Sequence, residues 1–169
     1  MLLMLLQRKS PSMIASQKNA GGKRISNNRP IEGINITPLS RLPAEGGEVW
    51  HAMKSSEPDF KGFGETYFSW IESGMIKGWK RHREMTMNVI VPVGLVKFVF
   101  FDSVGHLFQE VIIGVDHYSR ICVPPGLWFG FQGLTDSASL VMNIADMTHD
   151  PNEVERKAID LISYDWSKI

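Results

Sequence analysis

The segment that decides the fold lies near the middle of the chain and reads Gly74-Met75-Ile76-Lys77-Gly78-Trp79-Lys80-Arg81-His82. The stretch Met85-Thr86-Met87-Asn88 follows it and leads to Gly94. Side chains alternate between the two faces of a β-strand, so Lys80 and His82 should share one face with Gly78. Trp79 and Arg81 should point the other way.

Lys80 and His82 allow two interpretations. If their face lines an interior, desolvation and a neighbouring cation would lower the pKa of either group, as for a base that works near neutral pH. If the strand lies at the rim, both groups are solvated and have no special chemistry. Spacing alone favours the solvated interpretation.

The apolar runs along the chain are short and are separated by turn residues, which predicts an all-β fold. The runs are rich in β-branched and aromatic residues and are bounded by Gly, Pro, Asp or Ser. We expect strands at residues 34–36, 48–53, 66–71, 88–93, 96–101, 108–113, 119–123 and 139–144. Many short strands with little helix are typical of a sandwich or a barrel.

One segment near the end of the chain carries helical signals. Asp150 is an N-cap candidate, Pro151 suits a first helical position, and Glu153 adds an acid to the first turn. We therefore expect a short helical stretch within residues 151–162. Capping is a better role for Asp150 than a dyad with His149, whose own role stays open.

Composition indicates one domain without a charge bias. The 169 residues include 18 basic and 18 acidic side chains, so no global attraction to nucleic acid or membrane is implied. The single cysteine, Cys122, cannot form an intrachain disulfide and is expected to be a buried thiol. Residues 1–30 predict a polar, flexible extension before a domain at 31–169. Residues 1–6 are too short for a signal sequence, and we expect a cytoplasmic protein.

Two glycine-framed motifs resemble those of the cupin proteins. Residues 74–94 match the first, and Val123-Pro124-Pro125-Gly126 followed by Phe129 matches the second. Metal-binding cupins carry histidine at the positions of Lys80 and Phe129, and a glutamate that is missing here. His82 alone cannot hold zinc or iron tightly. The resemblance implies a cupin-type jelly-roll β-barrel with a short C-terminal helical segment, and we expect no metal and no cofactor.

Further motifs resemble those of the dTDP-4-dehydrorhamnose 3,5-epimerase family of cupins. They occur in the family's order over residues 30–169 and read Pro30-Ile31-Glu32-Gly33-Ile34, Phe63-Gly64-Glu65-Thr66-Tyr67-Phe68-Ser69, Gly74-Met75-Ile76-Lys77-Gly78-Trp79, Val123-Pro124-Pro125-Gly126 and Tyr164-Asp165-Trp166. The resemblance implies a metal-free jelly-roll homodimer that acts on a dTDP-linked 4-keto-6-deoxy sugar. Such chemistry removes a proton alpha to a ketone and returns one on the other face, which needs a base, a donor for the enolate oxygen and an acid.

The family's catalytic positions are only partly preserved. Lys80 stands at the position of the catalytic histidine, Asn143 near that of the catalytic tyrosine, and Met87 at that of the enolate-stabilising lysine. Asp160 lies near the expected carboxylate partner of the histidine. The related nucleotide-sugar 3,4-ketoisomerases carry Arg-Gly-x-His-x-His in this strand, and His82 matches the second histidine. The catalytic candidates are therefore Lys80, His82, Asn143 and Asp160.

The resemblance also implies substrate contacts. Lys77 stands where the family has a basic contact to the diphosphate. The aromatic residues Trp128, Phe129 and Phe131 form either an apolar or stacking wall for a ligand or plain core. The substrate-binding candidates are Glu65, Tyr67, Ser69, Lys77, Trp128 and His149.

Three functions remain open at this point. The first is an epimerase or isomerase of a nucleotide-linked keto sugar in deoxysugar or polysaccharide biosynthesis. The second is a catalytically degenerate cupin that binds a sugar nucleotide, and the third is a structural cupin without a small ligand. A sugar nucleotide and a second copy of the chain are the expected partners, with no nucleic acid or membrane.

Overall fold

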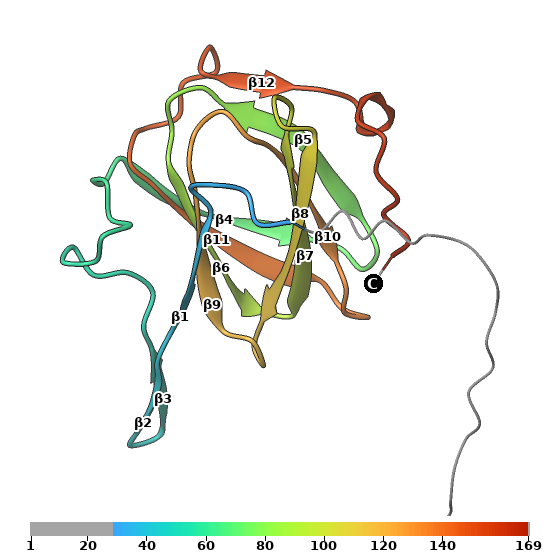
Figure 1. Ribbon diagram of the computed structural model, residues 1–169. Coiled ribbons are helices and arrows are strands. Elements are labelled where there is room, and N and C mark those ends of the chain that lie inside the picture. Colours follow the sequence, from blue (N-terminus) through green and yellow to red (C-terminus); the bar gives the residue numbers. More distant parts are fainter. Residues whose placement is uncertain (1–28, 169) are drawn as a thin grey trace, which may run out of the picture.

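Two antiparallel five-stranded sheets form the body of the computed structural model, which describes residues 29–168. The first sheet has the order β1 (Asn35–Pro38), β9 (Ser119–Val123), β6 (Met87–Val93), β11 (Ser139–Ala145) and β4 (Glu65–Ile71). The second has the order β12 (Val154–Arg156), β5 (Ile76–His82), β10 (Trp128–Gly133), β7 (Leu95–Asp102) and β8 (Leu107–Gly114). A separate hairpin, β2 (Arg41–Ala44) and β3 (Gly47–Trp50), projects from the body (Figure 1).

The main core lies between the two sheets. Inward side chains alternate along each strand, so β6 contributes Met87, Val89 and Val91 while β10 contributes Phe129 and Phe131. These five side chains are all buried in a single apolar cluster. Burial of this apolar surface is the main favourable term that holds the two sheets face to face.

A second apolar cluster covers the outer face of the second sheet. Trp79 of β5 and Trp128 of β10 pack there with Trp166 from the C-terminal segment. Lys97 of β7 is fully buried on the same face and donates hydrogen bonds to the backbone carbonyls of Trp166 and Lys168. These contacts hold the C-terminal segment against the outer face of the second sheet.

Strand β5 contains an irregularity that changes which of its side chains face inward. Lys80 pairs with Phe129 and Lys77 pairs with Phe131, so the register shifts by one residue between them. Gly78 lies at this shift, where a Cβ atom would approach the Cα of Gly130 to 2.8 Å. Only glycine fits so close to another backbone. The shift brings Lys77 to the inner face although it is three residues before Lys80.

The all-β prediction is confirmed, with two corrections. The sheets are not closed into a barrel, because their edge strands do not pair with each other within the described residues. The helical segment is only a single 3₁₀ turn, η1 (Ile159–Leu161), with no side-chain cap. Asp150 caps a turn instead, accepting a hydrogen bond from the backbone N–H of Asn152 at 2.8 Å. Residues 154–156 form strand β12, which pairs with β5.

One smaller expectation also has an outcome here. Cys122 is buried, and desolvation raises the pKa of its thiol to about 11. The predicted extension at residues 1–30 falls, except for its last two residues, outside the described residues. No helix within residues 29–168 is long and apolar enough to cross a membrane.

Candidate functional site

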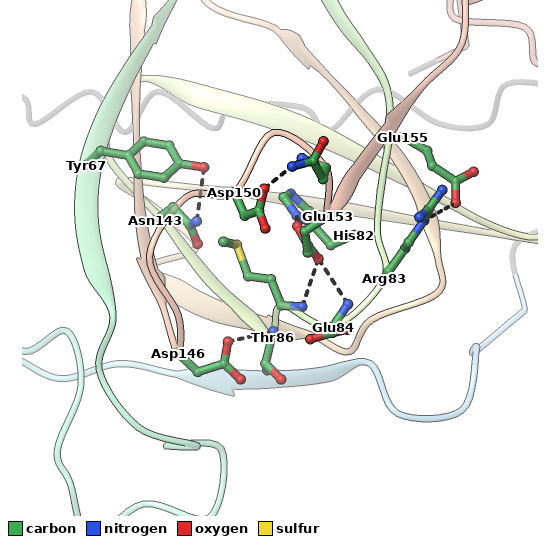
Figure 2. A network of polar contacts seen from close by, with 12 residues as sticks. Tyr67, His82, Arg83, Glu84, Thr86, Asn143, Asp146, Asp150, Glu153 and Glu155 are labelled. Atoms are coloured by element: carbon green, nitrogen blue, oxygen red, sulfur yellow. Dashed lines mark hydrogen bonds and ion pairs between the residues drawn. The ribbon is translucent and has the colours of Figure 1, made fainter.

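A buried histidine–carboxylate pair lies at the C-terminal end of β5, on the face that points between the sheets. The Nδ1 atom of His82 is 2.6 Å from Oε2 of Glu153, in the turn before β12 (Figure 2). His82 is only 7% exposed, and its ring stacks on Phe129 with a centroid distance of 5.9 Å. With Nδ1 held by the carboxylate, the other ring nitrogen, Nε2, has no hydrogen-bond partner among residues 29–168. A neutral imidazole held in this way presents Nε2 as a proton acceptor.

Glu153 is fixed by the backbone as well as by His82. Its Oε1 atom accepts hydrogen bonds from the backbone N–H groups of Glu84 at 3.0 Å and Met85 at 2.9 Å. Burial alone would raise the pKa of this carboxyl, but the two amides and His82 outweigh it and lower the pKa to about 2. Glu153 is therefore ionised at neutral pH and orients the His82 ring through Nδ1.

Lys80 lies beside this pair on the same strand face. Its backbone pairs with Phe129 of β10 and Arg156 of β12, whereas its ammonium group makes no hydrogen bond or ion pair with any described residue. Burial lowers the pKa of its ammonium group, and the positive charges of Arg156 and Lys77 lower it further. The structure therefore supports the interior interpretation of Lys80 and His82 over the solvated one.

Lys77 connects the two sheets at one side of the site. Its Nζ atom donates hydrogen bonds to Oγ of Ser69 at 3.2 Å and to the backbone carbonyl of Trp70, both on β4. Ser69 faces inward because its partner on β11 is the buried core residue Val141. Lys77 thus lies on the inner side of β5, although it is two residues before the outward-facing Trp79.

Asn143 and Tyr67 are two polar residues of the first sheet whose side chains point toward the part of the site that contains His82. Asn143 of β11 is only 3% exposed and pairs with Tyr67 of β4, and its Nδ2 donates a hydrogen bond to the Tyr67 hydroxyl at 3.1 Å. Figure 2 shows this pair at the left of the view and His82 with Glu153 near its centre. The Oδ1 atom of Asn143 is buried without a hydrogen-bond partner. A buried polar atom without a partner is uncommon in folded proteins, and a functional site is one explanation for it.

The remaining candidates divide between this site and other parts of the molecule. Glu65 pairs with the buried Ala145, so its half-buried side chain also faces inward. His149 is exposed in the loop between β11 and β12. Trp128 is not part of the site, because alternation along β10 turns it to the outer face while Phe129 points inward. Asp160 is exposed in η1, and the carboxylate that contacts the histidine is Glu153 instead.

Glu153 is the residue that sequence reasoning missed. Asp150 and Pro151, which lie three and two positions before Glu153, are also standard signals for a helix start, and this concealed the turn that aims Glu153 at β5. The sequence offered no clear signal for this strand, because Val154 is the only β-branched residue of β12. No group of three or more His, Cys, Asp or Glu within residues 29–168 is arranged to hold a metal ion.

The architecture and the inner polar groups together define a jelly-roll cupin with acid–base side chains between its sheets. No family model matches the sequence. A solved dTDP sugar isomerase from Desulfovibrio desulfuricans is 35% identical to this chain, with a TM-score of 0.77. The match covers 82% of this chain and 94% of the isomerase. The chain belongs to the dTDP-4-dehydrorhamnose 3,5-epimerase family of dTDP-sugar epimerases and isomerases.

One further relative and one further solved structure are similar to this chain. A probable low-salt glycan biosynthesis epimerase of Haloferax volcanii is 27% identical over 137 residues, covering 76% of this chain and 87% of the relative. The solved dTDP-6-deoxy-D-glucose-3,5-epimerase of Legionella pneumophila, in complex with dTDP-4-keto-L-rhamnose, has a TM-score of 0.69 at 16% identity. That match covers 79% of this chain and 77% of the Legionella protein and supports the shared fold.

Proposed function

We propose that this protein is a metal-free epimerase or isomerase of a dTDP-linked 4-keto-6-deoxyhexose in polysaccharide or glycan biosynthesis. The 4-ketone acidifies the hydrogens on its neighbouring carbons. A base of the protein removes one of them, and the carbon–hydrogen electrons move to the ketone oxygen as an enolate forms. Return of a proton to the other face of the same carbon gives the epimer. Protonation of the former ketone carbon, with loss of the proton from the neighbouring hydroxyl, instead gives the isomeric ketone.

The observation that carries this proposal is the His82–Glu153 pair on the inner face of β5. A carboxylate on Nδ1 holds the ring and stabilises the imidazolium that forms when Nε2 accepts a proton. Lys80 is the second candidate base, because its lowered pKa favours the neutral amine more than for an exposed lysine. His82 and Lys80 lie on the same face of β5, which points into the space between the two sheets.

Uncompensated positive charge supports binding of a nucleotide diphosphate. Lys77, Lys80 and Arg156 form no ion pair with any carboxylate among residues 29–168, whereas Arg81 and Arg83 on nearby positions both pair with Glu155. Lys77 and Arg156 are near enough to Lys80 to lower its pKa. A diphosphate placed among the three would relieve their mutual repulsion and form charge-assisted hydrogen bonds.

We also propose that two copies of the chain form a two-fold homodimer. The projecting β2–β3 hairpin exposes Leu42 and Val49, and a two-stranded hairpin is marginally stable alone in water. The outer side of edge strand β4 exposes Phe68 and Trp70. Contact with a second copy would cover such surfaces and an open sheet edge. A cytoplasmic location stays a prediction from the sequence.

Solvent-deuterium exchange into dTDP-4-keto-6-deoxyglucose tests the proposed activity. The wild-type protein should catalyse exchange at a carbon next to the ketone. His82→Ala and Lys80→Ala should each lose most of this activity, and Arg81→Ala should retain it because Arg81 stacks on Trp128 on the outer face. Measurable dTDP binding without exchange would instead favour a binding module. Equal losses in all three variants would contradict the assignment of strand faces.

A further inference from the structure

We infer that Tyr67 is the proton donor on the face of the sugar opposite His82 and Lys80, and that Asn143 positions its hydroxyl. This inference rests on the proposed function and extends it to a residue expected only to bind substrate. It also accounts for an asparagine at the place where the family's tyrosine is expected.

The position of Tyr67 follows from the contact between Lys77 and Ser69. That contact places β4 and β5 across from one another on the two sheets. Moving along each strand from this contact, the next inward-facing residue is Tyr67 on β4 and Lys80 on β5. The phenol and the candidate bases therefore approach the intervening space from opposite sheets, as inversion at a carbon requires.

The other two tyrosines of the chain lie elsewhere. The hydroxyl of Tyr118 donates a hydrogen bond to the backbone carbonyl of His51. Tyr164 packs in the aromatic cluster on the outer face of the second sheet. Among the described residues, Tyr67 is thus the only phenol on the inner face of the site.

The hydrogen bond from Asn143 determines how the Tyr67 hydroxyl is used. The amide Nδ2 donates to the phenol oxygen, so the phenol's own proton is directed to another acceptor. The same amide bond stabilises negative charge on that oxygen once the proton has left. The buried, unpartnered Oδ1 of Asn143 can accept a hydrogen bond from a hydroxyl of the sugar, which would hold the ring beside the phenol.

The proposed step balances without any additional reagent. The base on β5 takes the proton from the carbon next to the ketone, and the electron pair moves to the ketone oxygen. Tyr67 then gives its proton to the other face of that carbon as the carbonyl re-forms. The resulting phenolate takes a proton from water, and the protonated base releases one to water.

Comparison of exchange with inversion in D2O tests this inference. In Tyr67→Phe the base still removes the proton, exchanges it with solvent and returns deuterium on the original face. We therefore expect inversion at the same carbon to slow by about 100-fold relative to exchange, a typical loss for one acid–base group. Asn143→Leu should shift the ratio in the same direction by a smaller factor.

Tyr118→Phe is the matched control, because it removes a phenol hydroxyl outside the site and should change neither rate. Equal reductions of exchange and inversion in Tyr67→Phe, or unchanged inversion, would overturn the inference while leaving the proposed function intact. Absence of exchange in the wild-type protein would overturn both. Melting temperatures establish that the compared variants are folded.

Discussion

Oε2 of Glu153 and Nδ1 of His82 lie 2.6 Å apart although 71 positions separate the two residues in the sequence. The pairing of β12 with β5 brings them together, since Val154 is the direct partner of His82 in the ladder. The turn before Val154 then aims Glu153 back toward the ring. The short edge strand β12 therefore places the Glu153 carboxylate next to the candidate base, His82.

Replacement of Glu153 by glutamine should slow deuterium exchange by about 100-fold, because the amide neither selects the reactive tautomer nor stabilises the imidazolium. Glu155→Gln is the matched control, since Glu155 lies two residues further and pairs with Arg81 and Arg83 away from the site. Exchange rates at saturating substrate provide the measurement. Similar rates for both variants would show that Glu153 does not act through His82.

Stability should fall in acid through the same carboxylate. The pKa of Glu153 is about 2 in the folded protein against an ordinary value of 4.5. A lowered pKa means that ionised Glu153 stabilises the fold fully above pH 4.5, and that this contribution is lost as the pH falls toward 2. Melting temperatures across this interval should therefore decline more steeply for the wild type than for Glu153→Gln. Parallel curves would contradict the assignment.

Lys77 should contribute to nucleotide binding. Loss of one charge-assisted hydrogen bond predicts that Lys77→Ala binds dTDP about tenfold more weakly. The salt dependence of binding should also decrease, because one phosphate contact is gone. Lys157→Ala is the matched control, since the Lys157 ammonium lies over the Trp128 ring on the outer face. Calorimetry at two salt concentrations distinguishes the variants, and equal affinities would place the diphosphate elsewhere.

The proposed dimer predicts a doubled mass in light scattering at micromolar concentration. Val49→Asp in the exposed hairpin should shift the population toward monomer, because an unpaired charge at an apolar contact is costly. Val104→Asp makes the same change at an even more exposed valine, in the turn between β7 and β8, and should leave the mass unchanged. A monomeric wild-type protein would refute the proposal.

Local patterns in the sequence were sufficient to predict the strand faces near the site. Period-two alternation placed Lys80 and His82 together and Trp79 and Arg81 opposite, and the cation–π contact of Arg81 with Trp128 confirms the outer assignment. The Lys80–Phe129 pairing and the His82–Phe129 stacking confirm the inner one. Alternation does not continue to Lys77, because the strand has a register shift at Gly78, and this shift depends on how closely the Gly130 backbone approaches.

The residues that complete the site depend on long-range pairing, which single-sequence patterns do not encode. The Tyr67–Asn143 contact requires β4 to be the edge strand beside β11, and the Glu153–His82 contact requires β12 beside β5. Local signals also competed at Asp150 and Pro151, where a turn and a helix start have the same composition. The chain forms a turn here instead of a helix because the turn allows β12 to pair with β5.

The central claim is that inward-facing groups of β5 remove a proton next to a sugar ketone. Nuclear magnetic resonance of dTDP-4-keto-6-deoxyglucose, incubated with catalytic amounts of the wild-type protein in D2O, tests it most directly. We predict deuterium at a carbon adjacent to the ketone, and loss of that signal in the Lys80→Ala, His82→Ala double variant. An unchanged substrate spectrum with folded wild-type protein, or equal exchange by the double variant, would contradict the claim.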